Sequence, residues 1–454
     1  MPTNTEFCRS RQHLAEQMLA NSICLIPAAQ MVTRSRDTEY AFRQDSYFQY
    51  LCGFPEAQAW LAISNQANNP KTVNAHSVLF CADKDEDAEI WHGRRFGPNG
   101  AKKHFALDNA YSLDELDEQL LELLDGHDNL YFAQGHNADA DELVFALLQA
   151  LREAPKQSMQ APSNMVDVRP LLDEMRLFKS AGEIAIMRQA ADISGKAHIR
   201  AMQSAKAGLN EYHLEAHIHH EFAMHGAKHP AYGTIVGGGE NACILHYTDN
   251  NQALNDGDLV LIDAGCELQG YAADITRTFP VSGQFSPAQK QLYQLVLDAQ
   301  LAAFEQVKPG STFKQVGDAA IEVLCQGLIK LGLLAGSLKF NLDNKTYRQF
   351  FMHGIGHWLG LDVHDVGHYK IAGQDRPLQA GMVLTIEPGL YITPDADVDE
   401  QWLGIGIRIE DNLLVTADGY ENLTQQTPKT ISAIEALMTQ TSLSKNIPTQ
   451  VKSS

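Results

Sequence analysis

The chain has 454 residues, 44% of them hydrophobic and 20% charged, which is typical of globular proteins and long enough to predict two domains. Its formal net charge of −21 argues against a nucleic-acid or membrane partner, because such partners attract basic surfaces. Seven dispersed cysteines without a Cys-x-x-Cys pair, and a polar start with no apolar span of membrane length, predict a cytoplasmic protein.

Short apolar runs alternate with helical patterns over the first 170 residues. Strands are predicted at 22–28, 59–64, 77–82 and 129–135, and helices at 113–124 and 140–153. Alternation of this kind favours an α/β domain, which we place at residues 1–175. The polar, proline-containing segment 153–167 is interpreted as a connection near the end of this domain.

The second part of the chain opens with a helix signal. Ser180-x-x-Glu183 is a capping-box pattern, and apolar residues follow it at helical spacing. Further helices are predicted at about 210–226, 286–307 and 314–333, and strands within 234–247, 258–266, 272–281, 382–392 and 404–416. Because helices and strands are segregated, we expect an α+β domain over 176–440. Residues 441–454 are polar and are expected to form a disordered tail.

Two aspartates lie near a predicted hairpin in this second domain. Asp263 ends the apolar run 259–262, and Asp274 lies in the returning strand. If the turn centres on Leu268 and Gln269, the two aspartates face each other with Cβ atoms roughly 5 Å apart. Like charges that close are unfavourable unless one is protonated or a cation lies between them. Taken alone, the pair is equally compatible with aspartates that cap strand ends and face water.

Two glutamates repeat this pattern further along the chain. Glu387 follows the apolar run 383–386 and precedes a Pro-Gly turn. In the run 404–410, alternation places Arg408 and Glu410 on the face opposite Ile407 and Ile409. For Glu410 alone, a half-exposed surface strand explains the pattern as well as a site does.

Histidines supply the third element of the pattern. His353, His357, His364 and His368 lie within one sixteen-residue stretch. His353 and His357 have the i, i+4 spacing of a helical zinc site, but the intervening Gly-Ile-Gly lacks a glutamate and disfavours a helix. Four carboxylates with one imidazole predict an oxygen-rich divalent site that suits Mn²⁺, with Co²⁺, Fe²⁺ or Zn²⁺ left open. The set is large enough for two ions about 3.5–4 Å apart.

The carboxylates and the imidazole occur in an order that resembles a known family. Asp263, Asp274, His357, Glu387 and Glu410 match the ligand pattern of the pita-bread metallopeptidases, which include methionine aminopeptidase, prolidase and aminopeptidase P. The flanking stretches HYTDN, HGIGHWLGLDVHD, TIEPGLY and GIGIRIEDN, and EIWHGRR in the first domain, are similar to those of bacterial Xaa-Pro aminopeptidases. The resemblance spans about residues 5–440. It implies an α/β N-terminal domain followed by an α+β pita-bread (creatinase/aminopeptidase-like) catalytic domain.

The resemblance also implies a role for each residue of the site. Asp263 would chelate one of two Mn²⁺ ions, Asp274 and Glu410 would bridge both, and His357 and Glu387 would complete the second. A hydroxide bridging the metals would attack the scissile carbonyl, and Glu387 would accept the proton. The residues implied on the substrate side are His246 and His364, of which His364 would bond the oxyanion, the proline-pocket residues His353, Tyr391 and Arg408, and Trp91, which would approach a neighbouring subunit's active site in a homotetramer.

The predicted function is a dinuclear-metal exopeptidase that releases the N-terminal residue from peptides with proline in the second position. Prolidase, which cleaves only Xaa-Pro dipeptides, shares both domains and the ligand set and remains the closest alternative. A non-catalytic binding module is the alternative from another class, but such modules and creatinase lack the intact ligand set. Methionine aminopeptidase is disfavoured because it has no use for the first domain.

Overall fold

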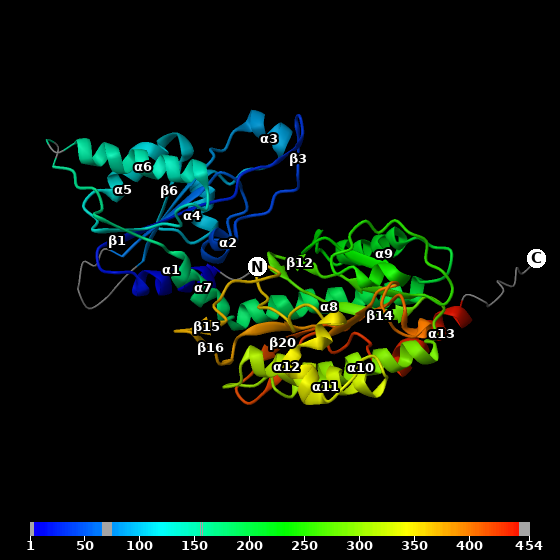
Figure 1. Ribbon diagram of the computed structural model, residues 1–454. Helices are drawn as coiled ribbons and strands as arrows, with labels where there is room; N and C mark the ends of the chain where they lie inside the picture. The colour runs from blue at the N-terminus through cyan, green and yellow to red at the C-terminus, as the bar shows by residue number, and fades with distance from the viewer. Residues whose placement is uncertain (1–3, 66–74, 155, 157, 445–454) are drawn as a thin grey trace, which may run out of the picture. The chain divides into compact units, whose positions relative to one another are not determined.

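The chain divides into two compact units, Met1–Arg176 and Leu177–Ser454. The computed structural model describes residues 4–65, 75–154, 156 and 158–444 (Figure 1). None of the helices in these ranges combines the length and the apolar character that crossing a bilayer requires.

Unit 1 is built on a mixed six-stranded sheet with the order β6-β5-β4-β1-β7-β8. The central strand β1 runs antiparallel to β4 and parallel to β7. A separate small hairpin joins β2 (Thr33–Ser35) and β3 (Thr38–Glu39). The sheet strands are β1 (Ser22–Pro27), β4 (Trp60–Ser64), β5 (His76–Cys81), β6 (Asn109–Ser112), β7 (Asn129–Tyr131) and β8 (Asn164–Val166).

Alternate residues of β1 enter two hydrophobic cores, one on each face of this sheet. Cys24 and Ile26 pack with α1 (Asn4–Gln17), α2 (Ser46–Leu51), α4 (Gly97–His104) and α7 (Arg169–Leu177). Ile23 and Leu25 pack with α5 (Leu116–Leu124) and α6 (Ala138–Glu153), which Figure 1 shows on one side of the blue strands. The period-2 alternation of a strand buried on both faces therefore produces the predicted α/β domain.

Unit 2 contains two pairs of long helices with curved strands between them (Figure 1). In the first pair, α8 (Ala181–Ser204) and α9 (Glu211–Met224), α8 packs on the strands β12 (Cys266–Leu268) and β13 (Tyr271–Ala272). In the second pair, α10 (Pro287–Phe304) and α11 (Phe313–Lys330), α10 packs on β17 (Val383–Ile386), β18 (Gly389–Ile392) and β19 (Ile405–Arg408). Ser180 and Glu183 form the predicted capping box at the start of α8. The shorter helices are α12 (Leu338–Asn344) and α13 (Ile431–Ser444).

The strands of unit 2 form several small sheets. Their orders are β10-β11-β14, β13-β12-β9, β17-β20-β21, β18-β19 and β15-β16. The bounds are β9 (His229–Pro230), β10 (Ile235–Gly238), β11 (Leu259–Asp263), β12 (Cys266–Leu268), β13 (Tyr271–Ala272), β14 (Thr276–Pro280), β15 (Lys370–Ile371), β16 (Gln374–Asp375), β17 (Val383–Ile386), β18 (Gly389–Ile392), β19 (Ile405–Arg408), β20 (Asp411–Val415) and β21 (Tyr420–Asn422).

Two predictions of secondary structure are corrected. Only 235–238 of the predicted strand 234–247 is a strand, because a 3₁₀ helix, Gly239–Cys243, follows at the glycine-rich stretch. Helix α13 continues to Ser444, so the first four residues of the predicted disordered tail are helical. The prediction for residues 445–454 lies outside the described residues.

The register of the hairpin that carries the aspartates also differs from the prediction. Asp263 pairs with Thr276, and Leu268 pairs with Tyr271, so the turn centres on Gln269 and Gly270. These two residues have φ of 55° and 90°. A two-residue hairpin turn with both central residues at positive φ favours glycine or a short polar residue, a preference that Gly270 meets and Leu268 does not. The observed partner of Asp263 lies two positions further along the chain than the predicted one. Asp274 is therefore a diagonal neighbour of Asp263 on the same face of the hairpin.

Candidate metal centre

A cavity of about 580 Å³ in unit 2 collects most of the residues predicted for the site. The predicted residues in its wall are Asp263, Asp274, His246, His353, His357, His364, Glu387, Arg408 and Glu410. Tyr391 is fully buried and contacts two of these residues from behind. Trp91 lies in unit 1 on α3 (Glu86–His92), where 83% of its surface is exposed.

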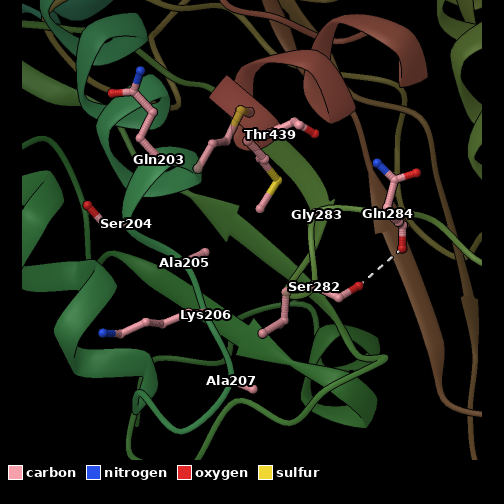
Figure 2. A pocket seen from close by; sticks show the side chains of 12 residues that line it. Gln203, Ser204, Ala205, Lys206, Ala207, Ser282, Gly283, Gln284 and Thr439 are labelled. Atoms are coloured by element: carbon pink, nitrogen blue, oxygen red, sulfur yellow. Dashed lines mark hydrogen bonds between the residues drawn. The ribbon is translucent and has the colours of Figure 1, made fainter. Parts of the chain in front are cut away.

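A second hollow in the same unit lacks this chemistry. It lies between the end of α8, the turn after β14 and helix α13 (Figure 2). Lys206 is the only charged side chain among the described residues that line it. The convergence of acids and histidines therefore distinguishes the first cavity as the candidate site.

The two aspartates are joined by a residue that the sequence reasoning missed. The Tyr232 hydroxyl lies 2.6 Å from Asp263 Oδ1 and 2.5 Å from Asp274 Oδ1. Arg408 Nη2 pairs with Asp263 Oδ2 at 2.7 Å. Tyr232 precedes β10, whose Ile235 pairs with Asp263, so its position follows from strand pairing and no spacing pattern in the sequence signals it.

The two glutamates lie where a pair of antiparallel strands is interrupted. Ile386 pairs with Asp411 on one side of the gap, and Gly389 pairs with Arg408 on the other. The same register continued through the gap places Glu387 opposite Glu410. Glu410 is only 1% exposed, so it is not the half-exposed surface residue that its strand pattern also allowed. Its Oε2 accepts a hydrogen bond of 2.7 Å from Thr276, a second residue that the sequence reasoning missed.

His357 faces the carboxylates with one ring nitrogen. Its Nε2 lies 3.3 Å from Asp274 Oδ2 and 3.7 Å from Glu387 Oε1, and its Nδ1 lies 2.9 Å from the Trp358 carbonyl oxygen. A carbonyl partner at Nδ1 assigns the proton to that nitrogen and leaves the Nε2 lone pair for a metal. The preceding Gly356 has no room for a Cβ, which would collide with the Thr385 carbonyl oxygen, so the segment packs directly against β17.

The remaining histidines border this cluster. The rings of His357 and His364 are 4.1 Å apart. His353 Nε2 lies 2.7 Å from the Tyr391 hydroxyl, which accepts a hydrogen bond of 3.0 Å from Arg408 Nη1. His246 also lines the cavity, and none of the described contacts joins it to the five predicted ligands. His353, Tyr391 and Arg408 are thus one connected group.

The carboxylates are poorly compensated by the protein itself. Burial and the charge of Asp263 raise the pKa of Asp274, and burial raises the pKa of Glu387 to about 7. Burial and the neighbouring carboxylates raise the pKa of Glu410 well above its usual range. Burial acts in the same direction on Asp263, but the Arg408 guanidinium holds its pKa below the usual value. Burial opposes the charge of His357, but Asp274 and Glu387 raise its pKa to about 9, so in the metal-free protein it partly compensates those two carboxylates. Arg408 neutralises Asp263, which leaves Glu410 without an ion pair among the described residues.

The donor set fits a divalent metal. Ligand atoms of Asp274, His357 and Glu410 all lie within 4.8 Å of one another, with Asp263 and Glu387 beside them. Carboxylate oxygens with an imidazole nitrogen are a normal ligand set for Mn²⁺, Zn²⁺ and related ions. A bound cation would also remove the repulsion that raises the pKa of Glu410.

Comparison with known proteins supports the same reading. The model of metallopeptidase family M24 matches residues 185–417, and that of the aminopeptidase P N-terminal domain matches residues 7–131. The chain is 51% identical to the Xaa-Pro aminopeptidase of Escherichia coli (strain K12) over 437 residues, covering 95% of this chain and 97% of that protein.

Solved structures agree along nearly the whole chain. Zinc-substituted E. coli aminopeptidase P in complex with product has a TM-score of 0.94 at 50% identity, covering 97% of this chain and 99% of that one. Pseudomonas aeruginosa aminopeptidase PepP has a TM-score of 0.94 at 47% identity, covering 98% and 99%. The predicted combination of an α/β domain with a pita-bread domain is confirmed. The chain belongs to metallopeptidase family M24, among the Xaa-Pro aminopeptidases.

Proposed function

We propose that this protein is a metal-dependent exopeptidase that releases the N-terminal residue from peptides with proline in the second position. The observation that carries the proposal is the convergence of four carboxylates and His357 in one cavity of a chain from this family. Its metal ligands are proposed to be Asp263, Asp274, His357, Glu387 and Glu410. Asp274 and Glu410 are buried, and Glu387 is half-buried. Divalent ions bound there would supply a water of lowered pKa and polarise the scissile carbonyl.

The chain's own residues would then handle substrate and protons. Glu387, whose Oε2 lies 3.8 Å from His353 Nδ1, is proposed to hold the proton released during attack. His364 and His246 are proposed to face the substrate, with His364 donating to the oxyanion. The group formed by His353, Tyr391 and Arg408 is proposed to receive the proline ring, whose nitrogen has no hydrogen to donate.

Further details of the proposal go beyond the family assignment. We infer two Mn²⁺ ions, because hard oxygen donors outnumber nitrogen donors four to one in the set. We also propose a cytoplasmic protein, since all seven cysteines, each within the described part of the chain, are free thiols. A homotetramer in which exposed Trp91 approaches a neighbouring active site completes the proposal.

Metal dependence is tested by chelation and reconstitution. The metal-free protein should lose all activity on an Xaa-Pro-Yaa peptide, because the carboxylates must be deprotonated and loaded with metal for turnover. Mn²⁺ should restore the activity better than Zn²⁺ or Co²⁺, because the donor set is rich in oxygen. Atomic absorption of the reconstituted protein measures the number of ions bound. Full turnover by protein with no measurable metal would refute the mechanism.

Substrate class is tested with a peptide panel read by mass. Xaa-Pro-Yaa and longer peptides should release free Xaa, and replacing proline by alanine should slow cleavage strongly because the proline pocket stays unfilled. The same panel separates prolidase, which must recognise a free carboxylate directly after proline. Rapid cleavage of Xaa-Pro dipeptides with resistant tripeptides would replace the present proposal by prolidase, and binding without cleavage would favour a non-catalytic module.

A further inference from the structure

Gln300 lies completely buried on α10, behind the two glutamates of the metal centre, and the function proposed above uses none of its atoms. Its side-chain Nε2 lies 3.2 Å from the carbonyl oxygen of Ile386 and 3.0 Å from that of Ile409. The residues that follow these two carbonyls are Glu387 and Glu410. One amide group therefore holds the peptides that precede two of the proposed ligands.

A missing backbone donor explains why Gln300 is needed at this point. Ile409 N donates to the Pro388 carbonyl oxygen at 3.2 Å. In an antiparallel hydrogen-bonded pair, the two residues normally exchange both N–H···O bonds. Proline has no N–H, so the Ile409 carbonyl receives nothing from Pro388 in return. Gln300 Nε2 donates to that carbonyl instead, which spares it the cost of burial without a partner.

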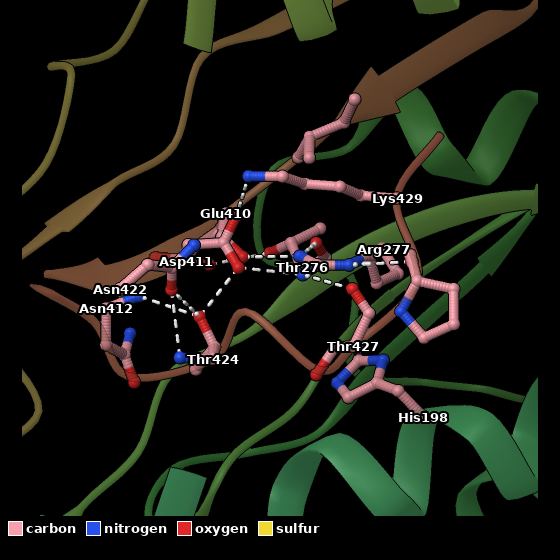
Figure 3. A network of polar contacts seen from close by, with 12 residues as sticks. His198, Thr276, Arg277, Glu410, Asp411, Asn412, Asn422, Thr424, Thr427 and Lys429 are labelled. Atoms are coloured by element: carbon pink, nitrogen blue, oxygen red, sulfur yellow. Dashed lines mark hydrogen bonds and ion pairs between the residues drawn. The ribbon is translucent and has the colours of Figure 1, made fainter. Parts of the chain in front are cut away.

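The other end of the amide is held by a charged network. Gln300 Oε1 accepts a hydrogen bond of 2.8 Å from Lys429 Nζ, which also pairs with Asp411 Oδ2 at 2.7 Å. Figure 3 shows Lys429 beside Asp411, which pairs on its other side with Arg277 at 2.7 Å. Since a lysine cannot accept, this contact sets the amide with its NH₂ group toward the two carbonyls.

We propose that Gln300 is a positioning residue of the metal centre. It supplies the donor that Pro388 lacks and so holds the backbones of Glu387 and Glu410 at a fixed separation. The inference rests on the proposed metal site, because its effect is on ligand spacing. Gln300 itself lies outside the cavity wall and touches no ligand side chain among the contacts described.

Two substitutions separate donation from the contact with Lys429. Gln300→Met removes both, whereas Gln300→Glu keeps an oxygen for Lys429 and replaces the donating NH₂ by an acceptor. Gln289→Met is the matched control, since Gln289 is also buried on α10 and donates from Nε2 to the Gly257 carbonyl at 2.8 Å, at the other end of the helix. Each full-length protein is measured by chelator competition for Mn²⁺, by the visible spectrum of its Co²⁺ form, and by urea unfolding without metal.

The expected result is a metal affinity about 10–100-fold weaker in both Gln300 variants, with an altered Co²⁺ spectrum, as found for groups that orient metal ligands. Gln289→Met should lose stability but keep wild-type affinity and spectrum. Wild-type affinity in either folded Gln300 variant would overturn the inference, as would an equal loss in Gln289→Met. A wild-type protein that binds no metal would instead refute the proposed function, and a Gln300→Met protein that fails to fold leaves Gln300→Glu to decide.

Discussion

Glu410 and Asp411 are neighbours in the chain and both are buried, but their surroundings shift the pKa values of the two carboxyl groups in opposite directions. Burial and nearby carboxylates raise the pKa of Glu410 well above its usual range. Burial acts in the same direction on Asp411, but Arg277 and Lys429 hold its pKa below the usual value. Figure 3 shows the Asp411 side, where the two cations and Thr424 surround the carboxylate.

The difference distinguishes a carboxylate of the candidate metal site, Glu410, from a carboxylate that supports the fold, Asp411. Asp411 is provided with its own cations and completes a permanent network, with Arg277 Nη1 donating to the Glu410 carbonyl oxygen at 2.6 Å. Glu410 accepts a hydrogen bond from Thr276, but it forms no ion pair with any described residue, and the neighbouring Arg408 pairs with Asp263. A carboxylate left uncompensated beside others indicates that the missing cation comes from outside the chain.

The largest effect is expected from Glu410→Gln on activity. Loss of the proposed bridging charge should lower turnover by more than roughly 10³-fold, beyond the effect of removing one oxyanion donor. The metal-free variant should be at least as stable as the wild type at pH 7. Burial and repulsion from the neighbouring carboxylates oppose the charged form of Glu410 in the metal-free protein, and glutamine removes that charge while keeping the shape of the side chain. Peptide turnover and urea unfolding in chelator measure the two quantities. A variant with near-normal turnover would contradict the bridging role.

Asp411→Asn should show the reverse pattern, with the main loss in stability. Removing one partner of a buried pair leaves two cations uncompensated, so we expect about 3–5 kcal/mol off the free energy of unfolding of the metal-free protein. Asp418→Asn is the control, because Asp418 is exposed and contacts only Thr416 among the described partners. Urea titration of the three proteins gives the values. Equal stabilities would show that the network does not support the fold.

His364→Ala should affect turnover while leaving the metal in place. The ring lies tilted beside that of His357 but is not proposed as a ligand. If it donates to the oxyanion, its removal should lower kcat by roughly 10²–10³-fold with metal content unchanged. Metal analysis on the same preparations is the control. Lost metal together with lost activity would make His364 part of the ligand set instead.

The smallest expected effect is on acid stability and concerns His198, also visible in Figure 3. Its ring is completely buried with Nε2 3.0 Å from the Ala264 carbonyl oxygen, and burial lowers its pKa to about 4. Between the unfolded value near 6.5 and about 4, only the unfolded chain takes up the proton, so stability falls as pH falls. The loss is about 1.4 kcal/mol per pH unit in that window.

The test is urea unfolding of the metal-free protein at pH 6.5 and pH 5. His198→Gln keeps a donor for the Ala264 carbonyl but does not titrate, so the wild type should lose about 2 kcal/mol more than the variant over this interval. Other titrating groups are common to both proteins and cancel in the difference. Parallel losses would show that His198 is protonated in the folded state.

The sequence pattern alone was enough to find the four carboxylates of the proposed ligand set, whereas the family resemblance selected His357 among four histidines. Each carboxylate ends or interrupts an apolar strand run, and a carboxylate in such a place is uncommon enough for the set to stand out. The helix from Ser180 was equally readable, because a capping box is a local pattern that needs no tertiary partner. Family resemblance then converted the pattern into an activity, which spacing by itself would have left open.

Other features depended on contacts between distant segments. The partner of Asp263 was set by a turn that requires positive φ at Gln269 and Gly270, which moved the register by two positions from the prediction. Tyr232 and Gln300 reach the site across 31 and 109 residues of chain, and nothing in their local sequence marks them. The opposite pKa shifts of Glu410 and Asp411 have the same origin. Asp411 contacts Arg277 and Lys429, whereas Glu410 points the other way, toward the carboxylates. Local sequence specifies backbone conformation and the chemistry of each side chain, whereas burial, charge compensation and register arise only when distant segments pack together.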